Sequence, residues 1–422
     1  PAGTRHGDFY ERCRGQLLRL VRRWVAHRSD RRALPSPEAI AALAPRDFAR
    51  QRPWLAPLTP LSRQSLGARI LIVAELSLPA CKRYRVDQKV DMFEHLGLET
   101  TVLDWRDAEA CRAALPFHGL LILYRVPAVP HMVLLATEAR RLGVPSFFDV
   151  DDLIFDWDAY RRQLLASGAA SDGLASAKAT TARYRQMLSH CQHGIGSTAA
   201  IARGMGEVVP GKTHVVPNAL DERILALAAE LERRPVKTDP RFVTIGYGSG
   251  SRTHDGDFGI VASALLAVMQ RHPQVRLAIH GPLELPAPFR RFADRVFQIP
   301  FLQGDDYLRA LASWQISIAP LEDSLFNEAK SNIKFIEAAI LGVPSICSGT
   351  GPFREAIEHG RTGLIAETPE EWEAALTRLV LDAGLRHGIA QEARRAVLSR
   401  YHPRVVATRQ LQQVVEPLLP AP

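Results

Sequence analysis

The feature that most constrains the fold of this chain is a repeated alternation of short, almost unbroken apolar runs with helix-like stretches. In the first series the runs are "ARILIVAEL", "ETTVLDW", "GLLILYRV", "VPSFFDV", "HGIGST" and "HVVPN". A second series contains "VTIGYG", "VRLAIHG", "VFQIP", "ISIAP" and "VPSIC". Strands that are apolar throughout are typical of parallel sheets covered by helices on both faces. We therefore predict an α/β fold of two Rossmann-like domains facing a cleft.

The two series and their flanks divide the 422 residues into four predicted parts. Residues 1–66 form a basic helical extension and linker, residues 67–225 a first Rossmann-like domain, and residues 236–395 a second. A polar, Pro-punctuated link joins the two domains. Residues 396–422 are predicted to form a helix that braces one domain against the other. The chain begins at Pro1 rather than Met, which is typical of a piece of a longer protein.

The net charge of +8 resides in the N-terminal extension, because residues 1–66 hold thirteen arginines, no lysine and five acidic residues. Within residues 9–28, apolar side chains recur at helical spacing with arginines between them, which predicts a basic amphipathic helix. Such a helix either makes a peripheral contact with an anionic membrane surface or packs on its own protein. Basic charge confined to this extension, without interleaved aromatic residues along a sheet, argues against a nucleic-acid binder.

Cysteine usage and hydropathy indicate the compartment. The five cysteines are scattered and form no C-x-x-C pair, which argues against a disulfide framework or a zinc site. No apolar run reaches the roughly 18–20 residues that cross a bilayer. We therefore expect a cytoplasmic protein.

The stretch "NEAKSNIKFIEAAILGVPSICSGTGPFREAIEHGRTGLIA", residues 327–366, contains the strongest site signal. Ser331 or Asn332 is a suitable N-cap for a helix that Gly342 ends. The N-terminus of such a helix offers unpaired amides and a positive dipole end, which favour an anion.

Three charged side chains surround this helix start. Lys330 lies in the loop ahead of it, and Lys334 and Glu337 share one helical face. Phosphates beside a ribose would suit the lysines and the glutamate together, because a carboxylate accepts hydrogen bonds from sugar hydroxyls. Alternatively, Lys334 and Glu337 only pair with each other on a solvated helix face.

Two glycine-containing loops favour the anion interpretation. Gly349, Thr350 and Gly351 lie between a predicted strand and a predicted helix, where small residues let backbone amides approach a phosphate. The other loop follows the first strand of the second series and contains, in order, Gly248, Ser249, Gly250, Ser251, Arg252, Thr253 and His254.

Residues 240–366 resemble the donor-binding half of glycosyltransferases with the two-Rossmann GT-B fold, nearest to family 4. The match is carried by "IGYGSG", "IHG", "ISIAPLED" and above all "KSNIKFIEAAILGVPSICSGTGPFREAIEHGRTGLI". The "KSNIK…E…GVP" variant resembles bacterial enzymes that build O-antigens and capsules. The first half matches more loosely, through "VPSFFDVDDLIFD" and "VVPNALD", and the resemblance spans about residues 68–400.

The resemblance implies roles for individual residues. Glu337 matches the second glutamate of the family's E-x7-E motif, which holds the donor ribose, and Lys334 and Lys330 lie where basic side chains meet the diphosphate or the sugar. The donor-contacting set is completed by Ser249, Gly250, Arg252, Ser331, Asn332, Gly349, Thr350 and Gly351. The chain departs from the motif at Ala329, where the first glutamate is expected. Either Glu328, one residue earlier, takes its place through an altered loop, or Asn327 and backbone amides do.

Three acids in "FFDVDDLIFD" follow a strand of the first half, so Asp149, Asp151 and Asp152 are expected to project toward the cleft. We favour one of them, Asp151, as a ligand of acceptor or donor-sugar hydroxyls. A D-x-D metal site and a purely structural N-capping role are the alternatives. Weaker candidates on this side are His118, His131 and the cluster Lys82, Arg83, Tyr84 and Arg85.

The predicted function is transfer of a sugar from a nucleotide-diphosphate sugar to a hydroxyl of a glycan or lipid-linked acceptor in bacterial surface polysaccharide synthesis. Lys330, Lys334, Asp151 and Glu328 are the predicted catalytic residues. The resemblance implies retention of anomeric configuration, and no metal or resident cofactor is predicted, the nucleotide sugar being a co-substrate. A location at the inner face of the cell membrane follows if the extension binds lipid. The alternatives are a non-catalytic GT-B module that binds carbohydrate or scaffolds a synthase, and a sugar-nucleotide epimerase.

Overall fold

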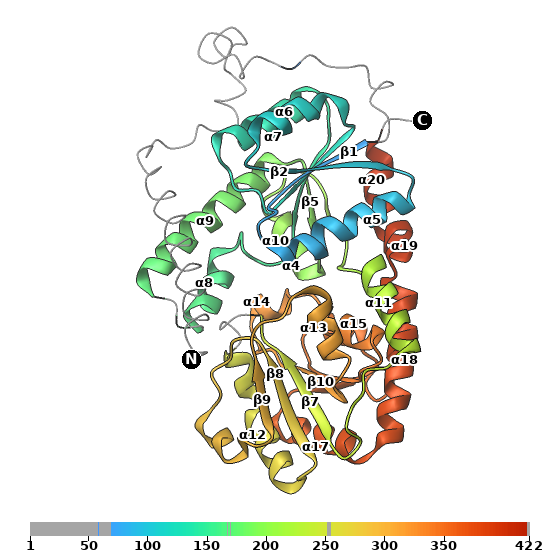
Figure 1. Ribbon diagram of the computed structural model, residues 1–422. Helices are drawn as coiled ribbons and strands as arrows, with labels where there is room; N and C mark the ends of the chain where they lie inside the picture. The colour runs from blue at the N-terminus through green and yellow to red at the C-terminus, as the bar shows by residue number, and fades with distance from the viewer. Residues whose placement is uncertain (1–57, 59–68, 167, 169, 251–254, 420–422) are drawn as a thin grey trace, which may run out of the picture. The chain divides into compact units, whose positions relative to one another are not determined.

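The computed structural model describes residues 58, 69–166, 168, 170–250 and 255–419. The predicted basic extension, with its membrane contact at residues 9–28, lies outside these ranges, as does Arg252. The described residues form two six-stranded sheets, each entirely parallel (Figure 1). This architecture confirms the predicted α/β class with two Rossmann-like halves.

The first half is built on the strand order β2-β1-β3-β4-β5-β6. Its strands are β1 Arg69–Ala74, β2 Glu99–Asp104, β3 Leu120–Tyr124, β4 Ser146–Val150, β5 His193–Gly196 and β6 Thr213–Val215. Its helical elements are α4 Pro79–Lys82, the π-turn η3 Arg83–Asp87, α5 Gln88–His95, α6 Ala108–Ala114, η4 Leu115–Phe117, α7 Pro130–Arg141, α8 Trp157–Ala166, α9 Ser171–His190 and α10 Ala199–Gly206. Strands β1, β3 and β4 are almost wholly buried, as their unbroken apolar runs predict.

The second half has the strand order β12-β11-β10-β7-β8-β9. Its strands are β7 Val243–Gly248, β8 Val275–His280, β9 Val296–Ile299, β10 Ile316–Ala319, β11 Ser345–Ser348 and β12 Leu364–Ala366. Its helical elements are α12 Asp255–Arg271, η6 Ala287–Phe292, α13 Gly304–Leu311, α14 Leu325–Glu328, α15 Ile333–Ile340, α16 Gly351–Ala356 and α17 Pro369–Leu381. Helices α12 and α17 pack in the core on one face of the sheet, and α15 and α16 pack in a second cluster on the other.

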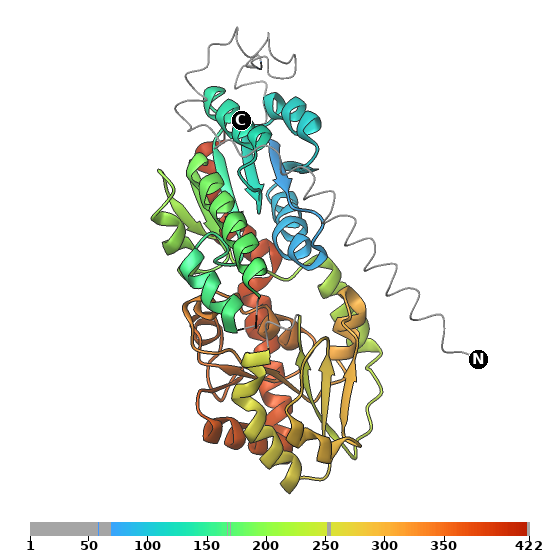
Figure 2. The ribbon, with the colours of Figure 1, turned by 90° about the vertical axis from the view of Figure 1, so that its left-hand side faces the viewer.

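Two further segments connect the halves. The predicted polar link contains a helix, α11 Glu222–Arg233, which Asp221 caps by accepting from the N–H of Ile224. The C-terminal run consists of α18 Ala383–Tyr401, α19 Pro403–Val406, η7 Ala407–Leu411, α20 Gln412–Val415 and η8 Glu416–Leu418. Helix α18 packs with α11 and α15 of the second half, whereas α19, η7 and α20 complete the core of the first half (Figures 1 and 2).

The strand orders show where ligands are expected. In the first sheet β1 lies between β2 and β3, and in the second β7 lies between β8 and β10, so each order reverses beside the first strand of its half. Open parallel sheets bind ligands at the carboxyl ends of their strands, at such a reversal. The loops that follow β1, β3 and β7 are therefore the first places to search.

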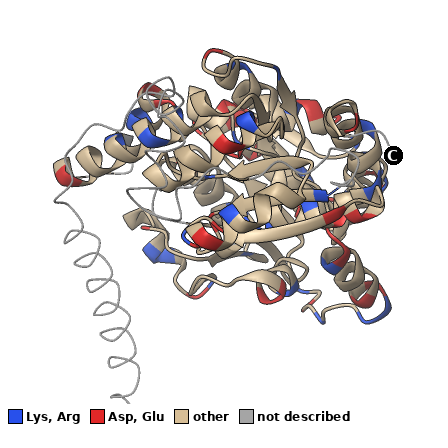
Figure 3. Cartoon of the chain, turned by 90° about the horizontal axis from the view of Figure 1, so that it is seen from above, with Lys and Arg blue, Asp and Glu red and all other residues tan. Residues whose placement is uncertain are grey.

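No helix among the described residues is both long and apolar enough to cross a membrane. Acidic and basic residues are mixed over the described part of the chain, without one broad patch of a single sign in the view of Figure 3.

Candidate active site

A cavity of about 1040 Å³ is lined by residues of both halves. Its lining includes the end of β7 and the loop after it, His280 at the end of β8, the first turns of α15, and Tyr84 on η3. This is the carboxyl edge of the second sheet, beside the reversal of its strand order. Ligand cavities typically measure about 300–1,000 Å³, so the space suits a nucleotide-sized molecule.

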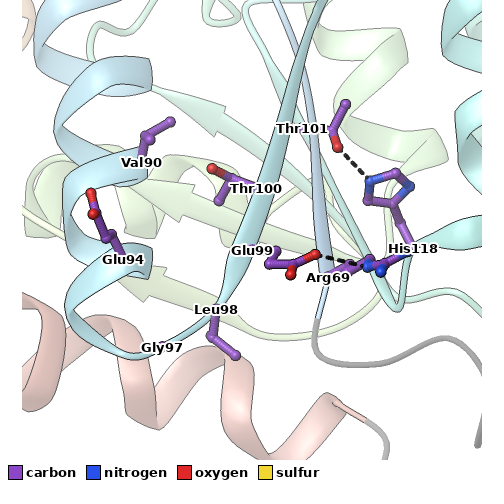
Figure 4. Close-up of a pocket in the computed structure, with 9 residues that line it drawn as sticks. All are labelled: Arg69, Val90, Glu94, Gly97, Leu98, Glu99, Thr100, Thr101 and His118. Atoms are coloured by element: carbon purple, nitrogen blue, oxygen red, sulfur yellow. Dashed lines mark hydrogen bonds and ion pairs between the residues drawn. The ribbon is translucent and has the colours of Figure 1, made fainter.

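A second cavity, of about 550 Å³, lies at the amino ends of β1 and β2. Figure 4 shows that its polar side chains already bond one another: His118 with Thr101, and Arg69 with Glu99. The other ring nitrogen of His118 bonds Ala114 O at 2.7 Å. This cavity is at the wrong end of a parallel sheet for the expected site, and His118 is a structural residue rather than an acceptor ligand.

Lys334 lies on the first turn of α15 and lines the larger cavity. Its Nζ atom is buried and has no hydrogen-bond acceptor among the described residues. The same atom lies 4.9 Å from the centroid of the Tyr247 ring. Burial, together with repulsion from Lys330, lowers the pKa of Lys334 to about 8. A buried ammonium group without an acceptor is costly, so this position is suited to an anionic ligand.

Lys330 precedes α15 and is only weakly paired. Its Nζ lies 3.9 Å from Asp257 Oδ2 and 5.7 Å from the centroid of the Phe326 ring. The other oxygen of Asp257 accepts from the side-chain amide of Asn327 at 3.0 Å. Lys330 therefore keeps most of its hydrogen-bonding capacity for another partner.

Glu337 lies one turn after Lys334 and is 3% exposed. Its Oε1 accepts a hydrogen bond from the hydroxyl of Tyr84, which belongs to the first half. Burial raises the pKa of Glu337 to about 7, against the lowering effects of the Tyr84 hydroxyl and the Arg83 guanidinium. No ion pair joins Lys334 to Glu337 within the described ranges. The alternative that the two residues only pair on a solvated helix face is therefore wrong.

The loop between β11 and α16 has one polar group satisfied and one unsatisfied. The N–H of Gly351 donates to Glu328 Oε2 at 2.8 Å, so Glu328 caps α16. A Cβ on Gly351 would lie 2.8 Å from the same oxygen, so a larger residue would displace the end of the Glu328 side chain. Thr350 Oγ1 is buried without a partner among the described residues. Glu328 and Gly351 thus satisfy each other, whereas Thr350 can still bond a ligand.

The loop after β7 is held by β8. The N–H of Ser249 donates to His280 O at 2.8 Å, and its hydroxyl donates to Pro282 O at 2.5 Å. Gly281 has φ +109, and a Cβ there would lie 2.0 Å from Ser249 O. Ser249 and Gly250 line the cavity, but the polar groups of Ser249 are already bonded within the protein.

The residues between Lys330 and α15 contact other parts of the protein. Ser331 Oγ accepts from the side-chain amide of Asn218 at 3.0 Å. Asn332 is the N-cap of α15 by position, but its side chain makes no capping bond and donates to Tyr401 Oη at 2.7 Å. The expected side-chain cap is therefore absent at this helix start.

In the first half, two of the three predicted acids share one arginine. Arg125 follows β3 with φ 50 and is the one non-glycine residue of positive φ in the described part of the chain. Its guanidinium donates to Asp151 Oδ1 at 3.0 Å and to Asp152 Oδ2 at 2.5 Å. Burial and the neighbouring Asp151 raise the pKa of Asp152. Strained backbone of this kind concentrates at functional sites.

The third acid, Asp149, is fully buried and belongs to an ion triad with Arg85 and Lys89. Arg85 is 1% exposed and is thus a structural residue rather than a ligand of the acceptor. Nearby, His131 bonds Trp105 O at 3.2 Å. Among the described residues, no group of three or more His, Cys, Asp or Glu side chains is arranged to hold a metal ion.

Sequence reasoning missed three contributors to this region. Tyr84 was noted only as part of a basic cluster, and nothing in its neighbourhood predicts a contact with Glu337 across 253 positions. Asn218 is the last residue of "HVVPN" and Arg125 the last but one of "GLLILYRV", two runs that were recognised as strands. Their position at the carboxyl end of a parallel strand was the one signal that could have singled them out.

Comparisons with known proteins agree with the fold. Residues 254–412 match a family model described as glycosyl transferase-like. HepE of Anabaena, solved with UDP and glucose, is 15% identical, with 83% of this chain and 99% of that chain covered at a TM-score of 0.54. Sucrose-phosphate synthase of Thermosynechococcus elongatus is also 15% identical, with 83% of this chain and 98% of that chain covered at a TM-score of 0.54.

A third structure, AviGT4, a glycosyltransferase involved in avilamycin A biosynthesis, is 16% identical, covers 83% of this chain and 98% of that chain, and has a TM-score of 0.53. A search of curated proteins finds no match. The described chain thus has the GT-B glycosyltransferase fold, as the sequence predicts, and residues 254–412 are similar to a glycosyl transferase-like family.

Proposed function

We propose that this protein transfers a sugar from a nucleotide-diphosphate sugar to a hydroxyl of a glycan or lipid-linked acceptor. The single observation that carries the proposal is the buried Lys334 ammonium group, which lines a nucleotide-sized cavity without an acceptor among the described residues. The solved structure of HepE with UDP and glucose supports the same ligand class, because that protein shares the fold.

The cavity lining and the two loops beside α15 and α16 offer a partner to each part of the donor, although Lys330 and Thr350 do not themselves line the cavity. Lys334 and Lys330 bind the diphosphate, and Glu337 accepts hydrogen bonds from the ribose hydroxyls. Phe301 lines the cavity with 47% of its surface exposed, which gives the flat base an apolar ring to stack on. Thr350 supplies a further hydroxyl toward the phosphates or the sugar.

In the reaction, the bond between the anomeric carbon and the diphosphate oxygen breaks, and a bond from that carbon to the acceptor oxygen forms. Negative charge grows on the departing diphosphate, so fixed cations directed at that charge lower the barrier. The acceptor proton passes to the leaving phosphate oxygen, which balances the step without a protein nucleophile. Attack from the face that the diphosphate leaves retains the anomeric configuration.

The lysines are proposed to neutralise the diphosphate in place of a divalent cation. Asp151 and Asp152, the acids of the D-x-D alternative, are both paired with Arg125 and are therefore less suited to hold one. Asp151 remains our candidate for a hydroxyl of the acceptor or the transferred sugar, and Glu328 for the transferred sugar. Both would have to exchange a present partner for a sugar hydroxyl.

The finer assignments rest on the sequence resemblance. It favours a family 4-like enzyme of bacterial O-antigen or capsular polysaccharide synthesis, acting in the cytoplasm at the inner face of the membrane. The nucleotide sugar serves as co-substrate, and no resident cofactor is proposed.

The test is a thermal-shift screen with UDP-, GDP-, dTDP- and CMP-sugars, followed by a product assay with glycan acceptors. A nucleotide sugar that binds only the native state raises the melting temperature. We expect one nucleotide class to do so and to release its diphosphate when acceptor is added. Tight binding without transfer or hydrolysis would favour the non-catalytic module, and isomerisation of the donor without acceptor would favour an epimerase. No binding by any nucleotide sugar would overturn the proposal.

A further inference from the structure

We propose that Asn218 and Thr198, both in the first half, are positioning residues for the loop of residues 329–332, which carries Lys330 and leads into the helix of Lys334. The inference rests on the proposed function, because it treats this loop as the part that grips the donor diphosphate. It assigns a role in donor binding to side chains that do not line the donor cavity.

Two hydrogen bonds from the first half reach the loop on either side of Lys330. Thr198 Oγ1 donates to Ala329 O at 2.9 Å, and the Asn218 amide donates to Ser331 Oγ at 3.0 Å. Thr198 and Asn218, which donate these hydrogen bonds, are only 7% and 3% exposed, so both bonds are protected from competition by water. The backbone around Lys330 is therefore held by side chains from the first half.

Arg85 fixes the direction of the Asn218 amide. Its guanidinium donates to Asn218 Oδ1 at 3.0 Å and to Val216 O at 2.8 Å. A guanidinium group only donates, so the carbonyl oxygen of Asn218 must face Arg85. The amide nitrogen is then left to donate to Ser331, as observed.

Arg85 itself is anchored by Asp149 at the end of β4. Both oxygens of Asp149 accept from Arg85, at 2.8 and 3.0 Å, and Lys89 Nζ lies 2.6 Å from Asp149 Oδ2. Buried ion groups of this kind often add no stability over apolar replacements. We infer that the triad is useful because it fixes the position of Asn218, and with it the loop.

The loop needs such support because Lys330, which it carries, repels Lys334 on the helix that follows. Lys330 is one of the groups that lower the pKa of Lys334, and within the described residues the nearest ion-pair partner of Lys330 is Asp257, at 3.9 Å. Without the hydrogen bonds to Ala329 and Ser331, this repulsion would move the ammonium groups apart. They would then no longer be preorganised for one diphosphate.

The test compares Asn218→Ala, Asn218→Asp and the unchanged full chain. Calorimetry with UDP, GDP and dTDP measures affinity, and hydrogen exchange measures the protection of the backbone amides of residues 327–336. We expect Asn218→Ala to weaken binding of the preferred nucleotide about fivefold to tenfold, the effect of one lost buried hydrogen bond, and to speed exchange in the loop. Asn218→Asp should restore affinity to within about twofold, because its second oxygen can accept from the Ser331 hydroxyl.

Gln192→Ala is the matched control. Its side-chain amide accepts from the N–H of Ser146 at 3.0 Å, at the opposite end of the same sheet. This variant should leave nucleotide affinity and loop exchange unchanged. Ser331→Ala removes the same hydrogen bond from the other side and replaces Asn218→Ala if that variant does not fold.

One outcome would overturn this inference and leave the proposed function intact. In that outcome the unchanged chain binds a nucleotide, and Asn218→Ala and Ser331→Ala have the same affinity and the same loop exchange as the unchanged chain. No binding of UDP, GDP or dTDP by the unchanged chain, and no binding of their sugars, would overturn the inference together with its basis in the proposed function. A loss of affinity in Asn218→Ala that Asn218→Asp does not restore would show a packing effect and would also overturn it.

Discussion

The carboxyl edges of the two sheets both carry charged side chains, but their charges are balanced in different ways. In the first half, Arg125 contacts both Asp151 and Asp152, and Arg85 is enclosed by its acceptors. In the second half, the Lys334 ammonium has no acceptor among the described residues, and Lys330 reaches Asp257 only at 3.9 Å.

This difference distinguishes charged side chains that stabilise the fold through internal ion pairs from charged side chains that are available to bind a ligand. A paired ion group has its electrostatic energy largely satisfied inside the fold, so its removal is felt as a loss of stability. An unpaired buried cation raises the energy of the fold, and an anion that binds there relieves that cost. Variants on the two edges should therefore have opposite signatures.

The largest effect is expected from Arg125→Met, which leaves two neighbouring carboxylates without their shared partner. The free energy of unfolding should fall by about 3 kcal/mol, measured by urea denaturation, because breaking a buried pair exposes uncompensated charge. Nucleotide affinity should change less than about twofold. Arg69→Met, which breaks an exposed pair with Glu99, is the control and should cost less than about 1 kcal/mol. A large loss of nucleotide affinity in Arg125→Met would contradict the proposed difference between the carboxyl edges of the two sheets.

Lys334→Met should show the opposite signature. Donor affinity measured by calorimetry should fall at least about tenfold, because a charged hydrogen bond to phosphate is lost. The melting temperature should not fall, since the variant removes a buried ammonium group that lacks an acceptor. Lys178→Met, an exposed lysine on α9, is the control. A clear loss of stability with unchanged donor affinity would show that Lys334 is a structural residue, like the paired charges of the first half, and not a ligand of the donor.

The pH dependence of affinity sharpens the comparison further. Lys334, with a pKa of about 8, loses its charge as pH rises above 8, and Glu337, with a pKa of about 7, loses its charge as pH falls below 7. Affinity for the nucleotide sugar should therefore be greatest between these values and fall by up to about tenfold per pH unit outside them. Glu337→Gln should be weaker at pH 7.5 and lack the fall on the acid side. An unchanged acid limb in Glu337→Gln would contradict this assignment.

The smallest effect is expected at the apolar end of the cavity. Phe301→Ala should weaken nucleotide binding about threefold, which is within the range for loss of one aromatic stacking contact. Phe297→Ala is the matched control, because that ring is 46% exposed on β9 but does not line the cavity. Equal effects of the two substitutions on calorimetric affinity would remove Phe301 from the site.

The fold could be predicted from the sequence because both sheets are encoded locally. The central buried strands, such as β1 and β3, are continuous apolar runs. The helices carry local start signals, as in α17, where Thr368 and Glu371 form a capping box. The parallel arrangement then places the ends of β4 and β7 and the start of α15 at carboxyl edges. Lys334, Glu337 and the three acids after β4 were found in this way.

The partners of these residues could not be predicted, because each pairing joins distant segments. Tyr84 and Glu337, Asn218 and Ser331, and Glu328 and Gly351 meet only through the tertiary fold. The sequence shows that Asp149, Asp151 and Asp152 are close together. It does not show that Asp149 is enclosed by Arg85 and Lys89 while the other two face Arg125.

The return of the C-terminal run to the first half has a consequence for synthesis of the chain. Val406, Leu411 and Val415 belong to the same apolar cluster as Ile70 and Phe93, so the core of the first half is completed by residues that are translated after the second half. Domains commonly fold on the ribosome in order of synthesis. Here the first half cannot complete its apolar core until the second half and the C-terminal run have also been synthesised. A version cut after α18 would therefore be more prone to aggregate through its amino-terminal half than through the half that was shortened.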